Sequence, residues 1–310
     1  METAPLYEDV AEAPDGGRAF YVHTVDGTRI RFALWGGGSK GLAVVMPGRT
    51  ECLEKYGRMA GKLTERGFSV VIIDWRGQGL SDRLNNSTAV GHVDAFTDYQ
   101  DDLNAVLTHP EVAAINGPRT LFAHSMGGCI GLRALLTSDT FSAAVFSAPM
   151  WGLNLPGPNK LLAPILANVG TAFGMGKKTL AGQPKGFYLT RVPFEGNNLT
   201  HDRNHWDYMR NQVVAHPELG LGSPSFKWLK GALGEFKYFD TVEMPSIPCL
   251  IFVGGDESII SPAAIHKHSK AFSNGTLVEI DGARHEIWME TPERQAQSWA
   301  AIDSFLETAL

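Results

Sequence analysis

Cysteine is scarce in this sequence of 310 residues, since only Cys52, Cys129 and Cys249 occur. Three thiols cannot all pair, and each lies in a helix or strand pattern, which favours buried thiols in a reducing compartment over a disulfide framework. Long apolar runs are also missing, so no stretch is long enough to span a membrane. The N-terminus, residues 1–17, is acidic and interrupted by proline, unlike a signal peptide. These features predict a cytoplasmic protein.

Positive charge is not in excess either, because the formal net charge is −6. A chain of that charge offers no basic patch for nucleic acid or for an anionic membrane. No HExxH motif and no Cys/His spacing typical of a metal site occurs, so we expect no metal. Hydrophobic residues make up 44% of the chain and charged residues 19%, which is ordinary for a globular protein with a large core.

The most informative segment is Ala123-His124-Ser125-Met126-Gly127. It follows the apolar residues 120–122 and precedes a glycine-rich helical pattern from Gly127 onward. A serine between a strand and a helix with small neighbours is typical of a nucleophile elbow, which presents the serine Oγ above a sheet. Ala123 replaces the glycine usual at the first position. The alternative is that Ser125 is an ordinary helix N-cap.

A nucleophilic serine needs a histidine base and a carboxylate that orients it, in the chain order Ser, Asp or Glu, His. Residues 248–253 form an apolar strand pattern followed by Gly254-Gly255-Asp256-Glu257, and residues 276–280 form an alternating pattern followed by a loop with His285. We therefore predict Ser125, Asp256 and His285 as the catalytic residues. Two alternatives are that Asp256 only forms a turn, with Glu257 as the carboxylate, and that His285 is a surface loop residue.

Acyl transfer also needs two backbone N–H groups that bind the oxyanion. Met126, which follows the serine, supplies one by its position. The second should come from the loop after the apolar strand 42–46, which reads Pro47-Gly48-Arg49. We assign it to the amide of Arg49.

These segments resemble those of the α/β-hydrolases of the lysophospholipase L2 and monoacylglycerol lipase group. The similarity rests on residues 47–51, on Gly67-Phe68, on Asp74-Trp75-Arg76-Gly77-Gln78-Gly79-Leu80-Ser81-Asp82, on the elbow and on residues 282–286. It implies an α/β-hydrolase fold, an ester hydrolase activity and no cofactor. Asp74 and Arg76 are expected to hold loops rather than to take part in the chemistry.

Alternating strand and helix patterns predict an α/β fold, a mostly parallel central sheet with helices on both faces. Nearly a hundred residues lie between Pro149 and Ile247, far more than a crossover needs. We expect a mainly helical cap at residues 151–239, inserted after the sixth strand, and a core made of residues 1–150 and 240–310.

An apolar helix is expected at the start of this cap, at residues 161–169. Leu161, Leu162, Ile165 and Leu166 are candidates to line an acyl-chain pocket, and the alternative is that they pack onto the core. Arg49 and Arg203 are two guanidinium groups that a phosphate would suit, unless they are solvent-facing or structural.

Together these patterns predict a serine hydrolase that cleaves monoacyl lipid esters, either lysophospholipids or monoacylglycerols, through an acyl-enzyme. The alternatives are a small-ester esterase, a thioesterase or another α/β-hydrolase activity, and a non-catalytic ligand-binding module. We expect a small-molecule lipid ester as partner, no nucleic acid, and at most transient contact of the cap with a membrane surface. The sequence carries no indication of oligomeric state.

Overall fold

The computed structural model describes residues 1–310 except 86, 156, 158 and 180–185, and it leaves the side chains of residues 159–161 undescribed. Within the described part of the chain, a central sheet of nine strands runs in the order β1-β2-β3-β5-β4-β7-β8-β10-β11. Its strands are β1 (Glu2–Thr3), β2 (Arg18–His23), β3 (Arg29–Trp35), β4 (Leu42–Met46), β5 (Ser69–Ile73), β7 (Arg119–His124), β8 (Ala143–Ser147), β10 (Cys249–Gly254) and β11 (Gly275–Ile280). Two short strands, β6 (Val90–Gly91) and β9 (Ser223–Pro224), pair separately.

The sheet is antiparallel at one edge and parallel from β5 to β11. Strands β2 and β3 form the hairpin that Asp26-Gly27 predicts, with Gly27 in the left-handed region at φ +84°. Every residue of β4, β5 and β8 is buried, as expected for parallel strands covered on both faces. The α/β-hydrolase fold expected from the sequence is therefore confirmed.

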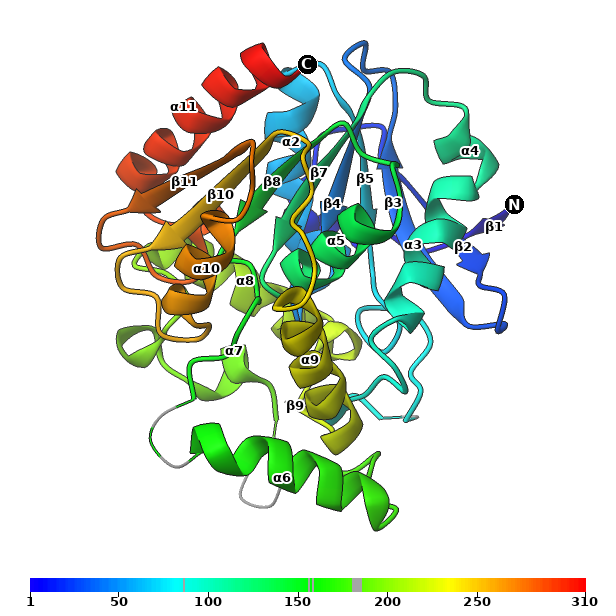
Figure 1. The fold of residues 1–310 in the computed structure, drawn as a ribbon. Coiled ribbons are helices and arrows are strands. Elements are labelled where there is room, and N and C mark those ends of the chain that lie inside the picture. The colour runs from blue at the N-terminus through cyan, green and yellow to red at the C-terminus, as the bar shows by residue number, and fades with distance from the viewer. Residues whose placement is uncertain (86, 156, 158, 180–185) are drawn as a thin grey trace.

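Helices cover both faces of this sheet (Figure 1). Helices α3, α5 and α10 lie on one face, whereas α2 and α11 lie together on the other, where Arg66, the residue that follows α2, pairs with Asp303 of α11. The helices of the core are α1 (Glu8–Ala11), α2 (Gly57–Glu65), α3 (Asp98–Thr108), α4 (Pro110–Ala113), α5 (Met126–Thr137), α10 (Pro262–Ser269) and α11 (Pro292–Ala309), with single 3₁₀ turns η1 (Leu53–Tyr56) and η4 (Ile287–Met289).

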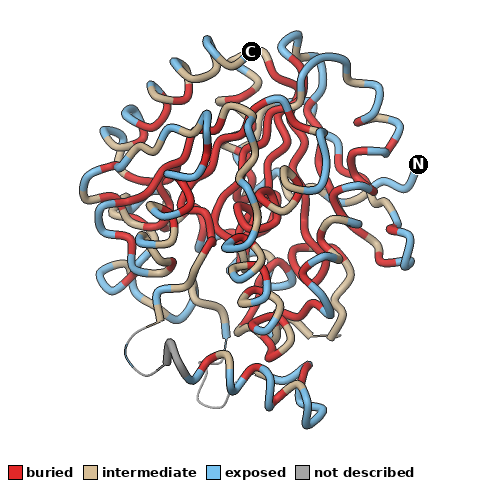
Figure 2. The backbone as a smooth tube through the Cα atoms, in the orientation of Figure 1, coloured by how far each residue is buried: buried red, intermediate tan, exposed pale blue. Residues whose placement is uncertain are grey.

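Strands β8 and β10 are hydrogen-bonded neighbours, so the chain between them leaves the sheet and returns to the adjacent position. This segment holds α6 (Asn159–Ala172), α7 (Tyr188–Arg191), α8 (Arg203–Ala215) and α9 (Phe226–Phe239), with 3₁₀ turns η2 (Phe194–Gly196) and η3 (Pro217–Leu219). In Figure 1 helix α6 lies far from the sheet, and Figure 2 shows much of its described surface exposed while the sheet is buried. Among the described residues, no helix has both the length and the apolar character needed to cross a membrane.

Candidate active site

Ser125 occupies the sharp turn between β7 and α5. Its backbone lies at φ +49° and ψ −115°, a conformation that a residue with a side chain adopts only at a cost. Neighbouring strands hold this turn, because the N–H of Ser125 donates to Ser147 O at 3.1 Å and its carbonyl accepts from Met150 N at 2.8 Å. The expected strand-to-helix turn at Ser125 is thus present.

Small residues after Ser125 let helix α5 approach the sheet closely. A Cβ at Gly127 would lie 2.0 Å from the carbonyl oxygen of Met46, and a Cβ at Gly128 would lie 2.6 Å from the Cβ of Pro149. Neither position has room for a side chain. Close packing of α5 against the sheet therefore requires glycine at both positions.

His285 lies in the loop between β11 and η4 and is paired with Glu257 rather than with Asp256. Its Nδ1 donates to Glu257 Oε2 at 2.6 Å, and both residues are buried. Asp256 is exposed and, among the described residues, makes no hydrogen bond or ion pair with His285. The expectation that Asp256 orients the histidine is therefore wrong, and the alternative carboxylate, Glu257, takes that place.

The turn after β10 explains why Glu257 rather than Asp256 pairs with His285. The N–H of Asp256 donates to Ala283 O at 2.9 Å, which ties the backbone of residue 256 to the loop of His285 while its side chain points to solvent. The next side chain turns inward, and Glu257 Oε1 accepts from the N–H groups of Ile259 and Ile260 at 2.6 and 3.2 Å. The carboxylate of Glu257 is thus held on both oxygens. No sequence feature distinguishes two adjacent acids in this turn.

The electrostatics of the pair favour a charged carboxylate beside a basic imidazole. Burial opposes the charge on each group, but the neighbouring charge and the hydrogen bond outweigh it. The pKa of His285 is consequently raised, with Glu286 and Glu51 adding to the effect of Glu257. The pKa of Glu257 is lowered below its usual value, helped by the two backbone N–H groups.

The loop after β4 contains the two residues that bracket the expected oxyanion donor. Gln78 lies in the Asp74–Asp82 motif, and its side chain spans this loop: Nε2 donates to Gly48 O at 2.9 Å and Oε1 accepts from Thr50 N at 3.1 Å. Thr50 has a positive φ of 67°, and Glu51 accepts a hydrogen bond from Gly48 N. The motif was expected to be structural, and Gln78 is the residue within it that shapes the loop around Arg49, a role that the sequence pattern alone does not reveal.

Asp74 and Arg76, also from this motif, hold loops as expected. Asp74 accepts from Leu53 N and Leu80 N and pairs with Arg31, and Arg76 pairs with Asp102.

Within the described residues, the backbone N–H groups of Arg49 and Met126 have no hydrogen-bond partner. Such unpaired donors are suited to an oxyanion.

A buried charged cluster lies next to His285. Lys55 Nζ donates to Glu51 Oε1 at 2.6 Å and to Glu286 Oε1 at 2.7 Å. The imidazole of His124 donates through Nδ1 to Ser147 O, while its Nε2 lies within 3.5 Å of both carboxylates and its ring centroid lies 4.7 Å from that of His285. Among the described residues, Glu51, His124 and Glu286 are close enough together to bind a metal, but the Lys55 ammonium already provides a cation there.

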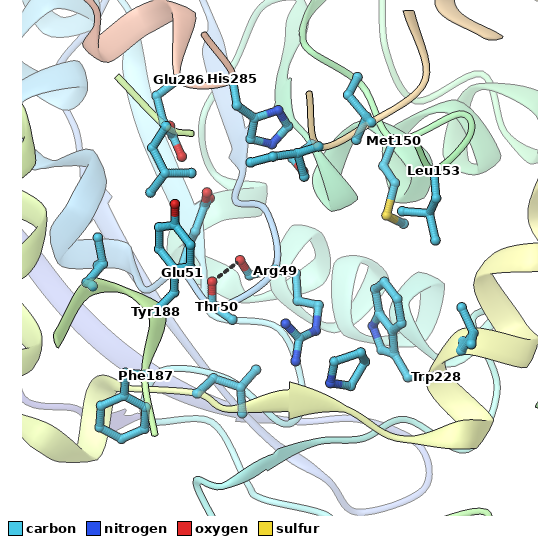
Figure 3. Close-up of a pocket in the computed structure, with 18 of the residues that line it drawn as sticks. Arg49, Thr50, Glu51, Met150, Leu153, Phe187, Tyr188, Trp228, His285 and Glu286 are labelled. Atoms are coloured by element: carbon cyan, nitrogen blue, oxygen red, sulfur yellow. Dashed lines mark hydrogen bonds between the residues drawn. The ribbon is translucent and has the colours of Figure 1, made fainter. Parts of the chain in front are cut away.

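A cavity of about 660 Å³ connects these residues to the inserted helices. Ser125 and His285 both line it, without a direct hydrogen bond between their side chains in the described structure; such bonds are often loose without substrate. Figure 3 shows His285 and Glu286 on one side of the cavity and Arg49 with Trp228 on the other. Most of the remaining lining is apolar, and includes Met150, Leu153, Met209, Val213 and Leu221.

Helix α6 contributes only part of the expected acyl-binding set. Leu162 and Leu166 line the cavity. Ile165 does not line it and is 57% exposed, because it lies on the outward side of the helix. The side chain of Leu161 lies outside the described residues. Arg203 is exposed on α8 and pairs with Asp207 at 2.8 Å.

Comparisons with known proteins agree with this geometry. Residues 37–292 match the family model described as serine aminopeptidase, S33. Lysophospholipase L2 of Escherichia coli is 30% identical over 279 residues, covering 85% of this chain and 79% of that protein. A probable lysophospholipase L2 of Haemophilus influenzae is 28% identical, covering 86% of this chain and 83% of that protein.

The fold also matches solved structures. A soluble variant of monoglyceride lipase from Saccharomyces cerevisiae superimposes with a TM-score of 0.73 at 20% identity, covering 96% of this chain and 98% of that one. The chain therefore belongs to the α/β-hydrolase family described as serine aminopeptidase, S33, and to the same family as lysophospholipase L2 of Escherichia coli.

Proposed function

We propose that this protein is a serine hydrolase that cleaves the carboxylic ester of a monoacyl lipid through an acyl-enzyme. The observation that carries the proposal is that a serine in a strained strand-to-helix turn and a carboxylate-paired histidine line one largely apolar cavity. The proposed catalytic residues are Ser125, His285 and Glu257, with the backbone amides of Arg49 and Met126 as oxyanion donors.

In this mechanism the histidine tautomer is set by Glu257. A carboxylate only accepts hydrogen bonds, so its contact with Nδ1 leaves Nε2 of His285 free to take the proton from Ser125 Oγ. The oxygen attacks the ester carbonyl, and the proton then passes to the leaving alcohol. Water, activated by the same imidazole, releases the fatty acid. Each oxyanion amide contributes ~3 kcal/mol of barrier lowering in such reactions.

The size and chemistry of the cavity support a lipid substrate. Its volume of about 660 Å³ and its largely apolar lining suit an acyl chain, and Leu162 and Leu166 extend this lining onto α6. The relatives named lysophospholipase L2 favour a lysophospholipid. We further propose residues 151–239 as a cap over the core of residues 1–150 and 240–310, and three unpaired buried cysteines favour a cytoplasmic location.

The outer side of the cap carries exposed apolar residues, which supports transient contact with a membrane surface. Ile165 is 57% exposed, Val169 46% and Phe173 78%, all in or just after α6. We expect Ile165→Asp combined with Phe173→Asp to reduce co-sedimentation with phosphatidylcholine vesicles while leaving hydrolysis of a dispersed short-chain ester unchanged. Equal co-sedimentation of the double variant and the wild type would contradict this contact.

The catalytic proposal is tested by a fluorophosphonate probe, which reacts only with an activated serine. We expect labelling of the wild type, none in Ser125→Ala, and loss of several orders of magnitude in ester hydrolysis in that variant. A non-catalytic binding module would not be labelled. A series of monoacyl esters tests the substrate class, since each methylene buried in the cavity adds up to ~0.8 kcal/mol to transition-state binding. Best activity on acetyl esters would instead indicate a small-ester esterase.

A further inference from the structure

The guanidinium of Arg49 is the unusual charged group in the cavity. Its Nη2 donates to the carbonyl oxygen of Gly222, and its Nε is buried without any hydrogen-bond partner. Among the described residues no carboxylate lies within ion-pair distance of it. Lys55, the other Lys or Arg among the described residues that line the cavity, is already held between two carboxylates. Within that described lining, Arg49 is therefore the cation that lacks an anionic partner.

This arrangement is costly for the free protein. A buried guanidinium is normally paired, as Arg31 is with Glu54 and Asp74 elsewhere in this chain. Arg49 as a whole is half-buried, but its Nε is enclosed. Desolvation of the guanidinium without a carboxylate partner lowers its pKa to about 10, which still leaves it charged at neutral pH. An anionic ligand in the cavity would supply the missing charge.

Several features hold the guanidinium in place toward the cavity. It lies over the indole ring of Trp228, with Cζ 5.4 Å from the ring centroid, so its edge remains available for hydrogen bonds (Figure 3). A Cβ at Gly91 would lie 2.8 Å from Nη2, so the absence of a side chain there leaves room for the guanidinium. The loop that carries Arg49 is itself fixed on both sides by Gln78.

Arg49 thus has two parts that face the same ligand. Its backbone N–H is the proposed oxyanion donor, and its side chain extends from that point toward Trp228 on the cap side of the cavity. In a lysophospholipid the phosphate lies at the other end of the glycerol from the acyl ester. A substrate with its carbonyl at the amide would therefore direct the phosphate toward a group in the position of this guanidinium.

We propose that the guanidinium of Arg49 binds the phosphodiester of a monoacyl glycerophospholipid and so makes the enzyme prefer this substrate to a neutral monoacylglycerol. The inference rests on the proposed function and adds a residue that selects the headgroup. Arg203, the other candidate from the sequence, does not fit this role, because it is exposed and paired with Asp207 outside the catalytic cavity.

The test compares lysophosphatidylethanolamine with monoacylglycerol of the same medium-length acyl chain, each kept below the concentration at which it aggregates. The readout is the ratio of kcat/KM for the two substrates, which cancels any effect of the substitution on the shared chemistry. We expect Arg49→Met to lower this ratio roughly tenfold to a hundredfold, as loss of a charge-assisted hydrogen bond does. Arg49→Lys should retain part of it, and the control Arg203→Met should leave it unchanged.

A second measurement uses the headgroup alone. Glycerophosphoethanolamine should inhibit hydrolysis of a neutral short-chain ester by the wild type, and should do so much more weakly in Arg49→Met and Arg49→Gln. An unchanged substrate ratio in both Arg49→Met and Arg49→Gln would overturn the inference, as would a ratio lowered equally in Arg203→Met. If the wild type hydrolyses neither monoacyl lipid, the proposed function itself fails, and this result differs from the two outcomes that overturn only the role of Arg49.

Discussion

Glu257→Gln should remove most of the catalytic activity while preserving the fold. The amide is nearly the same size as the carboxylate, and its oxygen can still accept from the N–H groups of Ile259 and Ile260. Its NH₂ group then faces Nδ1 of His285, where the wild type has an acceptor at 2.6 Å. The imidazole must turn Nδ1 into an acceptor, which places its proton on Nε2 and removes the base that Ser125 needs.

The expected magnitude follows from this change of tautomer. Loss of the orienting carboxylate in a serine triad lowers kcat by ~10⁴, which corresponds to ~5 kcal/mol of transition-state stabilisation. Asp256→Asn is the matched control, because it makes the same chemical change one residue earlier on an exposed side chain. A surface change of this kind alters free energies by only ~0.5 kcal/mol.

The assay is kcat for a monoacyl ester, together with the rate of fluorophosphonate labelling at Ser125 and a thermal melt that verifies folding. Glu257→Gln should also move the acidic limb of any residual activity to lower pH, because Glu257 contributes to the raised pKa of His285. Activity above about a tenth of wild type in Glu257→Gln would refute the assignment. So would a loss in Asp256→Asn as large as that expected for Glu257→Gln.

Three further predictions concern pH, packing and the buried cluster. Burial lowers the pKa of His285, but the neighbouring carboxylates outweigh it and raise this pKa. We therefore expect kcat/KM to fall with decreasing pH around a midpoint above the pKa of a free histidine. A flat profile between about pH 5 and 8 would exclude a histidine base. Gly127→Ala should lower the free energy of unfolding by at least ~1–3 kcal/mol in urea melts, because its Cβ would lie 2.0 Å from Met46 O. Gly234→Ala, in open space on α9, should raise it by ~0.5–1 kcal/mol, and equal effects of the two changes would contradict the packing argument. Lys55→Met should cost ~3–5 kcal/mol of stability, since it leaves two buried carboxylates without their cation; a loss below ~1 kcal/mol would mean that the cluster is not held by this charge.

Much of the fold was determined by local sequence pattern. The apolar segment 42–46 is β4 with the same bounds, and Asp26-Gly27, a dipeptide typical of hairpin turns, joins β2 to β3. The turn at Ser125 is also predictable locally, because the small residues that close packing requires after it are present in the sequence as Gly127 and Gly128. Such elements are predictable because periodicity, turn residues and steric limits act over a few neighbouring residues.

The partner of His285 was decided by the tertiary structure. Asp256 and Glu257 are adjacent, and successive side chains in an extended or turning chain point in different directions. Long-range contacts set which of them faces inward: Asp256 N donates to Ala283 O, and the Glu257 carboxylate binds His285. The same holds for Ile165, whose outward position depends on the rotation of α6 against the rest of the molecule.

Arg49 shows most clearly which properties follow from local sequence and which from tertiary structure. Its place after β4 was enough to predict a backbone donor, because strand ends in this fold lie beside the nucleophile. The environment of its guanidinium depends on Gly222 and Trp228, which are distant in the chain and come close only through the return of the inserted segment to the core. Burial and pairing of a charge are properties of three-dimensional packing, so no local pattern contains them.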